Sequence, residues 1–208
     1  MKLQEVNPHN YGWYEVKLDP FMVDHLWECI DQKEESMKHR LAGQIDQSYK
    51  IPDINLKFWK KYLYPLSERF SKQYGENFVS LPCSGDFVFH FDKFWVNYQN
   101  QYEYNPIHDH NGLFSFVIWM KIPTSYQKQV SLHNSKGTNH PVNSTFNFEY
   151  QDILGRSRSY MYKLGPEHEG TMLFFPSTLR HIVYPFYNCD EQRISISGNI
   201  GLKQPTNG

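Results

Sequence analysis

The first third of the chain shows the three- and four-residue apolar spacing of amphipathic helices. The first such stripe consists of Met22, Val23, Leu26, Trp27 and Ile30. Asp19 and Pro20 come just before it, and Asp is a favoured N-cap while Pro is favoured at the first helical position. The pattern therefore predicts a helix that begins at Pro20 and continues into a charged, solvent-facing stretch over residues 32–40.

A second helical stripe follows after a short gap. Its members are Trp59, Tyr62, Leu63, Leu66 and Phe70. Gly75 comes next and is expected to end the helix as its C′ residue. Two amphipathic helices ahead of a strand-rich region are expected to lie across one sheet and bury its outer face.

From Gly85 onward the pattern changes to short apolar runs between turn-forming residues, which is typical of strands. The runs cover residues 87–91, 94–98, 114–122, 146–150, 171–175, 182–186 and 194–200. Many short strands favour a sandwich or barrel. A polar insert over residues 125–144 is too long for a tight hairpin and is a candidate lid or substrate loop. Its His133 and His140 are expected to be exposed polar residues rather than metal ligands.

Composition narrows the class of protein. The length of 208 residues fits a single domain with a real core, and 17% aromatic residues suit strands around a pocket. The 21 basic and 22 acidic residues balance to a net charge of -1, so no nucleic-acid partner is expected. The cysteines Cys29, Cys83 and Cys189 form no paired motif, which favours a reducing compartment.

The sequence also bears on the location of the protein and on its oligomeric state. The N-terminus has no apolar core of signal-peptide length, and no apolar run is long enough to span a membrane. A cytoplasmic protein with no membrane association is therefore expected. A homodimer is compatible with the sequence, which does not fix the oligomeric state.

Candidate chemistry starts with His108 and His110. Residues two apart on a strand point to the same side, so these imidazoles would form a bidentate pair while Asp109 faces away. His181, far along the chain, is the candidate third ligand of a mononuclear iron site with open positions. Two other interpretations remain open: His108 and His110 are ordinary histidines, or a bulge turns Asp109 into the site.

A second feature lies near the C-terminus. Arg193, Ser195 and Ser197 alternate with isoleucines, so the three polar side chains share one face of a strand. If that face points into a barrel, the guanidinium needs an anionic partner. The partner is either an acidic residue of the protein or a dicarboxylate ligand that chelates the metal at its other end. Asn97 is a further candidate contact, and alternation then turns Tyr98 away from the site.

Two stretches resemble the Fe(II)/2-oxoglutarate-dependent oxygenase superfamily. One runs from Trp95-Val96-Asn97-Tyr98 through Pro106-Ile107-His108-Asp109-His110 to Pro123, and the other from Glu169-Gly170-Thr171 through His181 to Asn199. The most similar pattern is that of a small group of predicted oxygenases of bacteria and marine phages. The resemblance covers residues 85–200 and implies a double-stranded β-helix, a cupin-like jelly roll. Together with a mainly helical part over residues 1–84, this core would form a single oxygenase domain over residues 1–208.

The resemblance also implies site roles. His108 and His181 correspond to the two superfamily histidines, and Arg193 to the residue that pairs with the distal carboxylate of 2-oxoglutarate, assisted by Ser195. The chain departs from the pattern at His110, where the superfamily commonly has Asp or Glu. Imidazole in place of carboxylate raises the charge of the centre and changes its metal preference. A three-histidine centre is still compatible with iron dioxygenases.

The expected function is an Fe(II)-dependent dioxygenase, a hydroxylase that couples decarboxylation of 2-oxoglutarate to oxidation of an unidentified small-molecule or protein substrate. One alternative is a three-histidine, cupin-like metalloenzyme that does not use 2-oxoglutarate. Others are a noncatalytic jelly-roll binding module, or a site that binds metal and 2-oxoglutarate without turnover. Arg193 distinguishes the first alternative, because only an enzyme that uses 2-oxoglutarate needs it as a carboxylate anchor.

Overall fold

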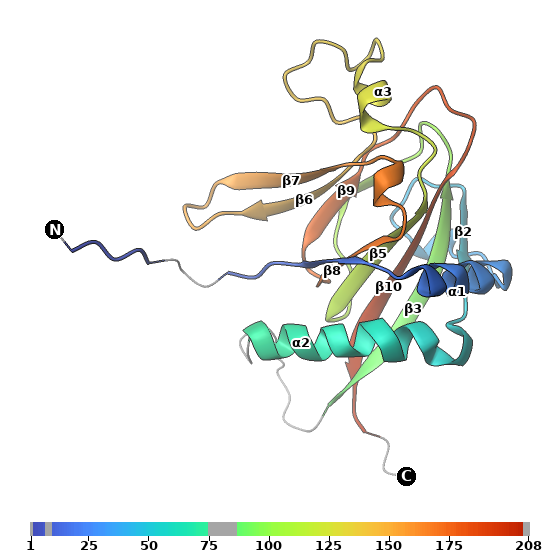
Figure 1. The fold of residues 1–208 in the computed structure, drawn as a ribbon, viewed down its shortest axis with the longest axis vertical. Coiled ribbons are helices and arrows are strands. Elements are labelled where there is room, and N and C mark those ends of the chain that lie inside the picture. Colours follow the sequence, from blue (N-terminus) through green and yellow to red (C-terminus); the bar gives the residue numbers. More distant parts are fainter. Residues whose placement is uncertain (1, 7–9, 75–86, 206–208) are drawn as a thin grey trace.

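A computed structural model describes residues 2–6, 10–74 and 87–205 (Figure 1). The described residues form two antiparallel sheets. The strands are β1 (Tyr14–Lys17), β2 (Gln47–Lys50), β3 (Val88–Gln99), β4 (Asn105–His108), β5 (Phe114–Lys121), β6 (Thr145–Gln151), β7 (Ser157–Lys163), β8 (Thr171–Pro176), β9 (Arg180–Val183) and β10 (Arg193–Lys203). The large sheet has the order β1-β8-β5-β10-β3-β2, and the small sheet the order β4-β9-β6-β7.

The last eight strands make the fold recognisable from connectivity alone. Strands β3, β5, β8 and β10 lie in the large sheet, whereas β4, β6, β7 and β9 lie in the small one. The chain thus passes back and forth between two facing four-stranded layers, which is the topology of a double-stranded β-helix, or jelly roll. Strands β1 and β2 extend the large sheet at its two edges. The predicted fold class, mainly β with N-terminal helices, is confirmed.

The two N-terminal helices cover the outer face of the large sheet (Figure 1). The helical segments are α1 (Pro20–Asp31), a π-helix (Trp59–Leu63), α2 (Tyr64–Tyr74), α3 (Tyr126–Val130) and 3₁₀ turns at Lys38–Arg40, Ile54–Leu56 and Pro166–His168. Helix α1 begins as predicted, because the Asp19 side chain accepts a hydrogen bond from the N–H of Met22. The predicted end of the second helix at Gly75 lies outside the described residues.

Side-chain alternation along β5 separates two cores. Phe116 and Ile118 point outward into a core shared with α1 and α2, where Leu26 and Phe70 are fully buried. Val117 and Trp119, which alternate with them, point inward, toward the small sheet, into a second core. That inner core consists of Val117, Trp119, Ile122, Phe146, Phe148, Tyr162, Leu164, Leu173 and Phe175. The helices therefore bury the outer face of the large sheet, as predicted.

The charged stretch over residues 32–40 is solvent-facing over much of its length but is not a continuation of the helix, so that part of the prediction is wrong. Helix α1 ends at Asp31. Beyond it the backbone pairs with β2: the N–H of Glu34 donates to the carbonyl of Lys50, and the N–H of Lys50 donates to the carbonyl of Glu35. Backbone groups used in this ladder cannot also form helical hydrogen bonds.

The strand predictions differ from the structure in detail. The runs over residues 87–91 and 94–98 are one continuous strand, β3, and the run over 182–186 is β9, which begins and ends earlier. Strands β1, β2, β4 and β7 were not predicted. Strands β1, β2 and β4 have only four residues each, and most side chains of β7 are polar and exposed. None of the four therefore gives the sequence pattern of a half-buried strand.

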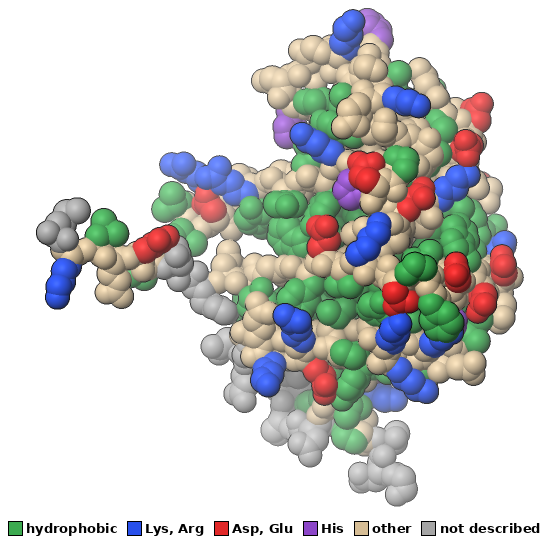
Figure 2. All heavy atoms as spheres, viewed as in Figure 1, with side chains coloured by type: hydrophobic (Ala, Val, Ile, Leu, Met, Phe, Trp, Pro, Cys, Tyr) green, Lys and Arg blue, Asp and Glu red, His purple; other side chains and the backbone are tan. Residues whose placement is uncertain are grey.

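The surface of the described residues shows no concentration of one charge on the face in Figure 2, where acidic and basic side chains are interspersed. This distribution agrees with the near-neutral net charge of the sequence. None of the described helices is long and apolar enough to cross a membrane.

Candidate functional site

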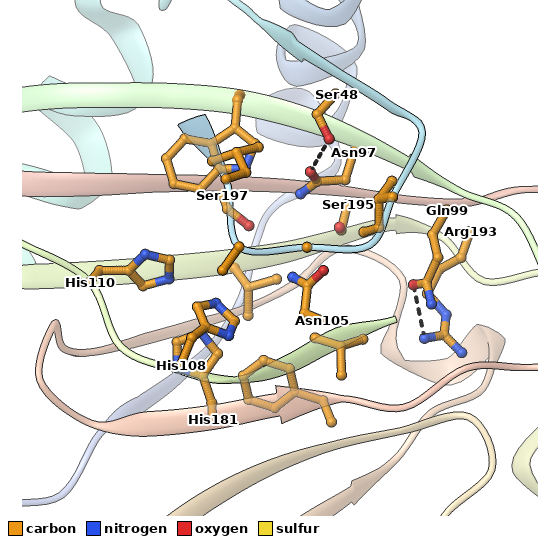
Figure 3. A pocket seen from close by; sticks show the side chains of 18 of the residues that line it. Ser48, Asn97, Gln99, Asn105, His108, His110, His181, Arg193, Ser195 and Ser197 are labelled. Atoms are coloured by element: carbon orange, nitrogen blue, oxygen red, sulfur yellow. Dashed lines mark hydrogen bonds between the residues drawn. The ribbon is translucent and has the colours of Figure 1, made fainter. Parts of the chain in front are cut away.

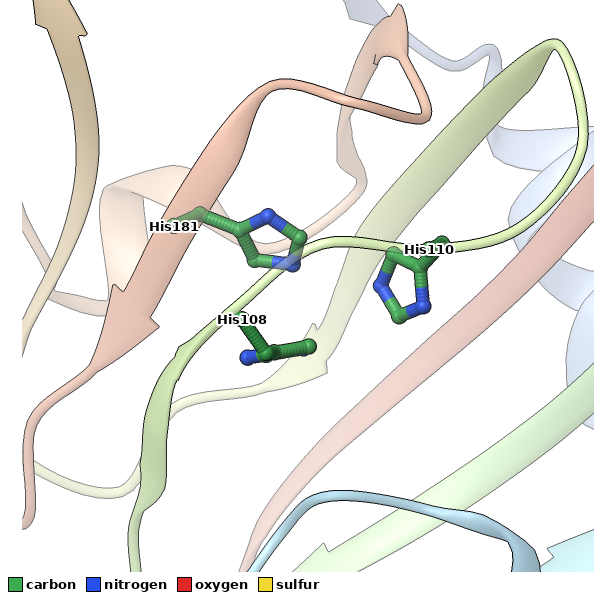
Figure 4. Close-up of side chains that lie close together, drawn as sticks. All are labelled: His108, His110 and His181. Carbon is green, nitrogen blue, oxygen red and sulfur yellow. The ribbon is translucent and has the colours of Figure 1, made fainter.

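Three histidines come together between the two sheets. His108 and His181 lie opposite each other in the β4–β9 ladder, and His110 follows two residues after the end of β4. One ligand nitrogen from each imidazole lies within 4.8 Å of the other two, and the three rings face a common space (Figure 4). The three ligands that the sequence predicts are thus brought together from distant parts of the chain.

Hydrogen bonds orient two of the imidazoles. Nδ1 of His108 lies 2.7 Å from the carbonyl oxygen of Pro106, and Nδ1 of His181 lies 2.9 Å from that of Leu179. A carbonyl only accepts, so each Nδ1 carries the proton and donates it, which leaves Nε2 as an unprotonated ligand. Backbone carbonyls that fix the tautomer in this way are a common outer shell of histidine–metal sites.

Burial keeps these imidazoles neutral. Desolvation lowers the pKa of His108 below its ordinary value, opposed by its hydrogen bond to Pro106 and by the charge of Asp109. The pKa of His181 lies well below its ordinary value because of desolvation, and then because of repulsion from His108 and His110. A neutral imidazole binds a cation without first losing a proton, so the cluster is prepared for a metal at neutral pH.

The local backbone explains why Asp109 does not join the cluster. Strand β4 ends at His108, and the N–H of His110 donates to the carbonyl of Ser177 over 2.9 Å. The expectation that both histidines lie on one strand is therefore wrong in detail, although both side chains face the cluster. Asp109, between them, is exposed and is not among the groups that could share a metal with the histidines of the described chain.

Arg193 lies in the same pocket and is almost completely buried, with 1% of its surface exposed. Its Nη2 donates to Ser144 Oγ over 2.6 Å, and its Nη1 donates to Gln99 Oε1 over 3.3 Å. Its Nε is buried without a hydrogen-bond partner among the described residues. The ring of Phe186 lies 4.9 Å from the guanidinium carbon. The hydrogen-bonding partners are neutral, so none of them compensates the charge.

The protonation state of Arg193 follows from its burial. Desolvation lowers its pKa to about 9, which still leaves the guanidinium charged at neutral pH. An uncompensated buried charge costs several kcal/mol, roughly, unless an anion pairs with it. With an unpaired Nε and no carboxylate beside it, the guanidinium would suit an anionic ligand at this end of the pocket.

Polar side chains from β10 and β3 line the floor between the arginine and the histidines (Figure 3). Ser195 pairs with Asn97 across the two strands, and Arg193 pairs with Gln99 in the same way. Asn97 is buried, and its Oδ1 accepts a hydrogen bond from Ser48 over 2.7 Å. The alternation predicted for β10 is confirmed, because its residues 193, 195 and 197 all line the pocket.

A segment before β2 covers the pocket. Residues Lys38, Leu41, Ala42, Gly43 and Ile45 contribute to its lining. At Gly43 the chain passes so close to Asn105 that an added Cβ would lie 2.2 Å from the Oδ1 atom of that side chain. Asn105 also lines the pocket, and its Oδ1 is buried without a hydrogen-bond partner among the described residues.

Other sequence predictions have clear outcomes. His133 and His140 are exposed, as expected, and Tyr98 packs on the outer side of the large sheet against Tyr49. Trp119 is a core aromatic that also forms part of the pocket wall. The insert over residues 125–144 contains the short helix α3.

Sequence reasoning missed two residues that hold Arg193. Gln99 could have been found, because it is two residues beyond Asn97 on a strand and therefore faces the same side. Ser144 had no such signal, because it is the last residue of an irregular insert. Its position in the pocket wall depends on long-range contacts.

The arrangement fits an iron centre with an acidic cosubstrate. Three converging imidazoles leave coordination positions open, as oxygen-activating iron sites require. Arg193 supplies an unpaired cation in the same pocket. A dicarboxylate that reached both would chelate the metal at one end and neutralise the guanidinium at the other.

Comparisons with known proteins point to one family. A family model described as "Putative 2OG-Fe(II) oxygenase" matches residues 93–199, slightly more than half of the 208 residues. No curated protein sequence matches the chain.

Several solved structures are distantly similar. A Pseudomonas putida prolyl-4-hydroxylase is 13% identical with a TM-score of 0.47, and the match covers 94% of each chain. OsALKBH1 is 16% identical with a TM-score of 0.46, covering 94% of this chain and 100% of the other. A Burkholderia pseudomallei oxidoreductase of the 2OG-Fe(II) oxygenase family is 13% identical with a TM-score of 0.43, covering 90% and 85%. These likenesses are too distant to carry an argument about the site.

Proposed function

The chain belongs to the 2OG-Fe(II) oxygenase family, whose members use Fe(II) and 2-oxoglutarate, and on that premise we propose roles for its own residues. His108, His110 and His181 hold the iron, and Arg193 anchors the distal carboxylate of 2-oxoglutarate. When bound, Fe(II) and 2-oxoglutarate would supply the activation of dioxygen that couples decarboxylation of 2-oxoglutarate to hydroxylation of a substrate C–H bond.

Each protein group has a distinct task in this proposal. The carbonyls of Pro106 and Leu179 hold two of the imidazoles with Nε2 toward the metal. Ser144 and Gln99 keep the guanidinium of Arg193 in one orientation, and its open Nε provides a donor for a carboxylate oxygen. Ser195 and Asn97 line the path between the two ends and offer further polar contacts.

Buried aromatic side chains form part of the pocket wall. Trp119, Phe146 and Phe175 are almost completely buried and line the pocket. An apolar wall strengthens the interaction between a guanidinium and a carboxylate, because the effective dielectric constant is lower than in water. It also protects reactive species from side reactions with solvent.

One observation carries the use of 2-oxoglutarate: Arg193 is a buried cation without an acidic partner in the pocket that contains the three histidines. A three-histidine metalloenzyme that does not use this cosubstrate has no reason to retain such a residue at its desolvation cost. A noncatalytic module has no reason to combine it with three preoriented imidazoles.

An anaerobic titration tests the proposal. Fe(II)-loaded protein is titrated with 2-oxoglutarate, and we expect the visible charge-transfer band that forms when the cosubstrate chelates iron. The band should require millimolar or higher 2-oxoglutarate in Arg193→Met, while iron binding itself is retained. Iron binding without a band in the wild type would favour the cupin-like alternative, and absence of iron binding would favour a noncatalytic module.

The proposed function includes a class of substrate. We propose a small molecule or a protein side chain, which the insert over residues 125–144 and the covering segment over residues 38–45 would contact. The near-neutral net charge, and the interspersed charges on the face in Figure 2, support this class over nucleic acid.

A further inference from the structure

A second cluster of potential metal ligands lies outside the pocket, in the helical layer on the other side of the large sheet. It consists of His25, Cys29 and Asp53, whose ligand atoms all lie within 4.8 Å of one another. His25 and Cys29 are one turn apart on α1 and therefore share a face of the helix. The side chains of all three residues are at most 3% exposed.

Hydrogen bonding explains only part of the geometry, because the 3.6 Å between His25 and Cys29 is within range for sulfur but the distance from His25 to Asp53 is not within range for oxygen. Nε2 of His25 lies 3.6 Å from both Sγ of Cys29 and Oδ1 of Asp53. The distance to the oxygen exceeds the usual N–H···O range of about 2.7–3.2 Å. A single ring nitrogen either accepts one S–H or donates one N–H, so a hydrogen bond with Cys29 leaves the approach of Asp53 Oδ1 to the same nitrogen unexplained.

The same distances fit a shared cation. Zinc bonds of about 2.0–2.1 Å to nitrogen, 2.0–2.2 Å to oxygen and 2.3 Å to sulfur, at tetrahedral angles, separate nitrogen from sulfur by about 3.6 Å and nitrogen from oxygen by about 3.4 Å. The observed 3.6 Å for both pairs is close to these values. A thiolate and a carboxylate would also neutralise a divalent cation, which removes the cost of burying net charge.

The surroundings orient Asp53 and place a carboxylate near His25. Oε2 of Glu28 lies 3.5 Å from Nδ1 of His25, the nitrogen that faces away from the cluster. A carboxylate behind a metal-binding imidazole is a common outer-shell arrangement. The N–H groups of Phe58 and Trp59 donate to the two oxygens of Asp53, and each oxygen retains a second lone pair.

We propose that His25, Cys29 and Asp53 form a zinc-type site, with a water molecule completing the tetrahedron. The mixed sulfur, nitrogen and oxygen donors suit zinc or cobalt and not magnesium or calcium, which prefer oxygen alone. The site ties α1 to the segment that leads into the π-helix and α2. Its role is therefore to hold the helical layer together on the sheet.

Cobalt(II) alone is the probe, because a thiolate bound to Co(II) gives an intense near-ultraviolet charge-transfer band. The three-histidine cluster contains no sulfur, so it cannot produce this band. Metal-free protein is titrated anaerobically with Co(II). We expect the band to saturate at one equivalent of sulfur-bound cobalt per chain, in the wild type and also in His181→Ala.

Cysteine variants identify the thiolate that gives the charge-transfer band. We expect Cys29→Ser to lose it, while Cys83→Ser and Cys189→Ser retain it. Absence of the band in the wild type, or its persistence at full intensity in Cys29→Ser, would overturn the proposal. If Cys29→Ser does not fold, Asp53→Asn replaces it, because the amide oxygen can still accept from one of the two helix N–H groups. That variant should bind Co(II) at this site at least about 10-fold more weakly, and unchanged affinity would equally overturn the proposal.

Discussion

Ser144 Oγ lies 2.6 Å from Nη2 of Arg193, so the last residue of the polar insert holds the buried arginine of the pocket. Ser144 is fully buried and has a positive φ of 58°, and its backbone is fixed by hydrogen bonds with Pro185 and Leu164. A non-glycine residue in the left-handed region needs such support. The insert is therefore coupled to the proposed cosubstrate anchor as well as to the rim of the pocket.

Removing this hydroxyl tests the coupling. Ser144→Ala should raise KM for 2-oxoglutarate by about 10-fold, because a hydrogen bond to a charged group contributes roughly 1.5–3 kcal/mol. The value of kcat should change less than about twofold, since the charge of Arg193 remains. Ser131→Ala is the matched control, because that hydroxyl bonds only within α3 and is exposed. Equal KM values in both variants would contradict the role given to Ser144.

Replacing Arg193 should separate stability from function. The side chain is buried without an acidic partner, so Arg193→Met should raise the thermal midpoint of the ligand-free protein. The same change should abolish the stabilisation that 2-oxoglutarate gives the iron-loaded wild type. Differential scanning fluorimetry with and without the cosubstrate measures both effects. If 2-oxoglutarate raised the thermal midpoint of Arg193→Met as much as that of the wild type, the anion would have to bind elsewhere.

Much of the fold and the site follows from local sequence patterns. The cap at Asp19, the polar face of β10 and the inward side of Asn97 each depend on residues nearby in sequence, and alternation or helical spacing finds them. The short strands and the contact between Ser144 and Arg193 depend on pairing across long stretches of chain. No local pattern encodes such pairing, since a four-residue strand gains its stability from its neighbours.

His110, the proposed third metal ligand, distinguishes this chain from the pattern it resembles. We expect His110→Ala to weaken Fe(II) binding by more than about 10-fold, because it removes one of three converging nitrogens. His110→Asp should retain binding, since a carboxylate is the usual ligand at this position of iron oxygenases of this type. Equilibrium Fe(II) titration under anaerobic conditions measures both affinities.

Asp109→Ala is the matched control for that experiment. Asp109 is exposed and does not belong to the cluster, so its removal should leave Fe(II) affinity within about twofold of the wild type. A large loss of Fe(II) affinity in Asp109→Ala, together with normal affinity in His110→Ala, would mean that the loop after β4 changes conformation when the metal binds. The ligand set would then contain the carboxylate.

The close approach of Gly43 to Asn105 gives a prediction about the space inside the pocket. A Cβ at position 43 would meet Oδ1 of Asn105 at 2.2 Å, so Gly43→Ala must displace that side chain. Asn105 lies between the histidines and Arg193 (Figure 3), where the displaced amide would narrow the path of the cosubstrate. We expect 2-oxoglutarate affinity to fall by about 10-fold, the equivalent of about 1.4 kcal/mol, because the cosubstrate must push the displaced amide aside again. Gly201→Ala is the control, because nothing lies within 4 Å of an added Cβ there, and it should bind like the wild type. Normal affinity in Gly43→Ala would show that the covering segment shifts outward instead, and that it does not set the width of the pocket.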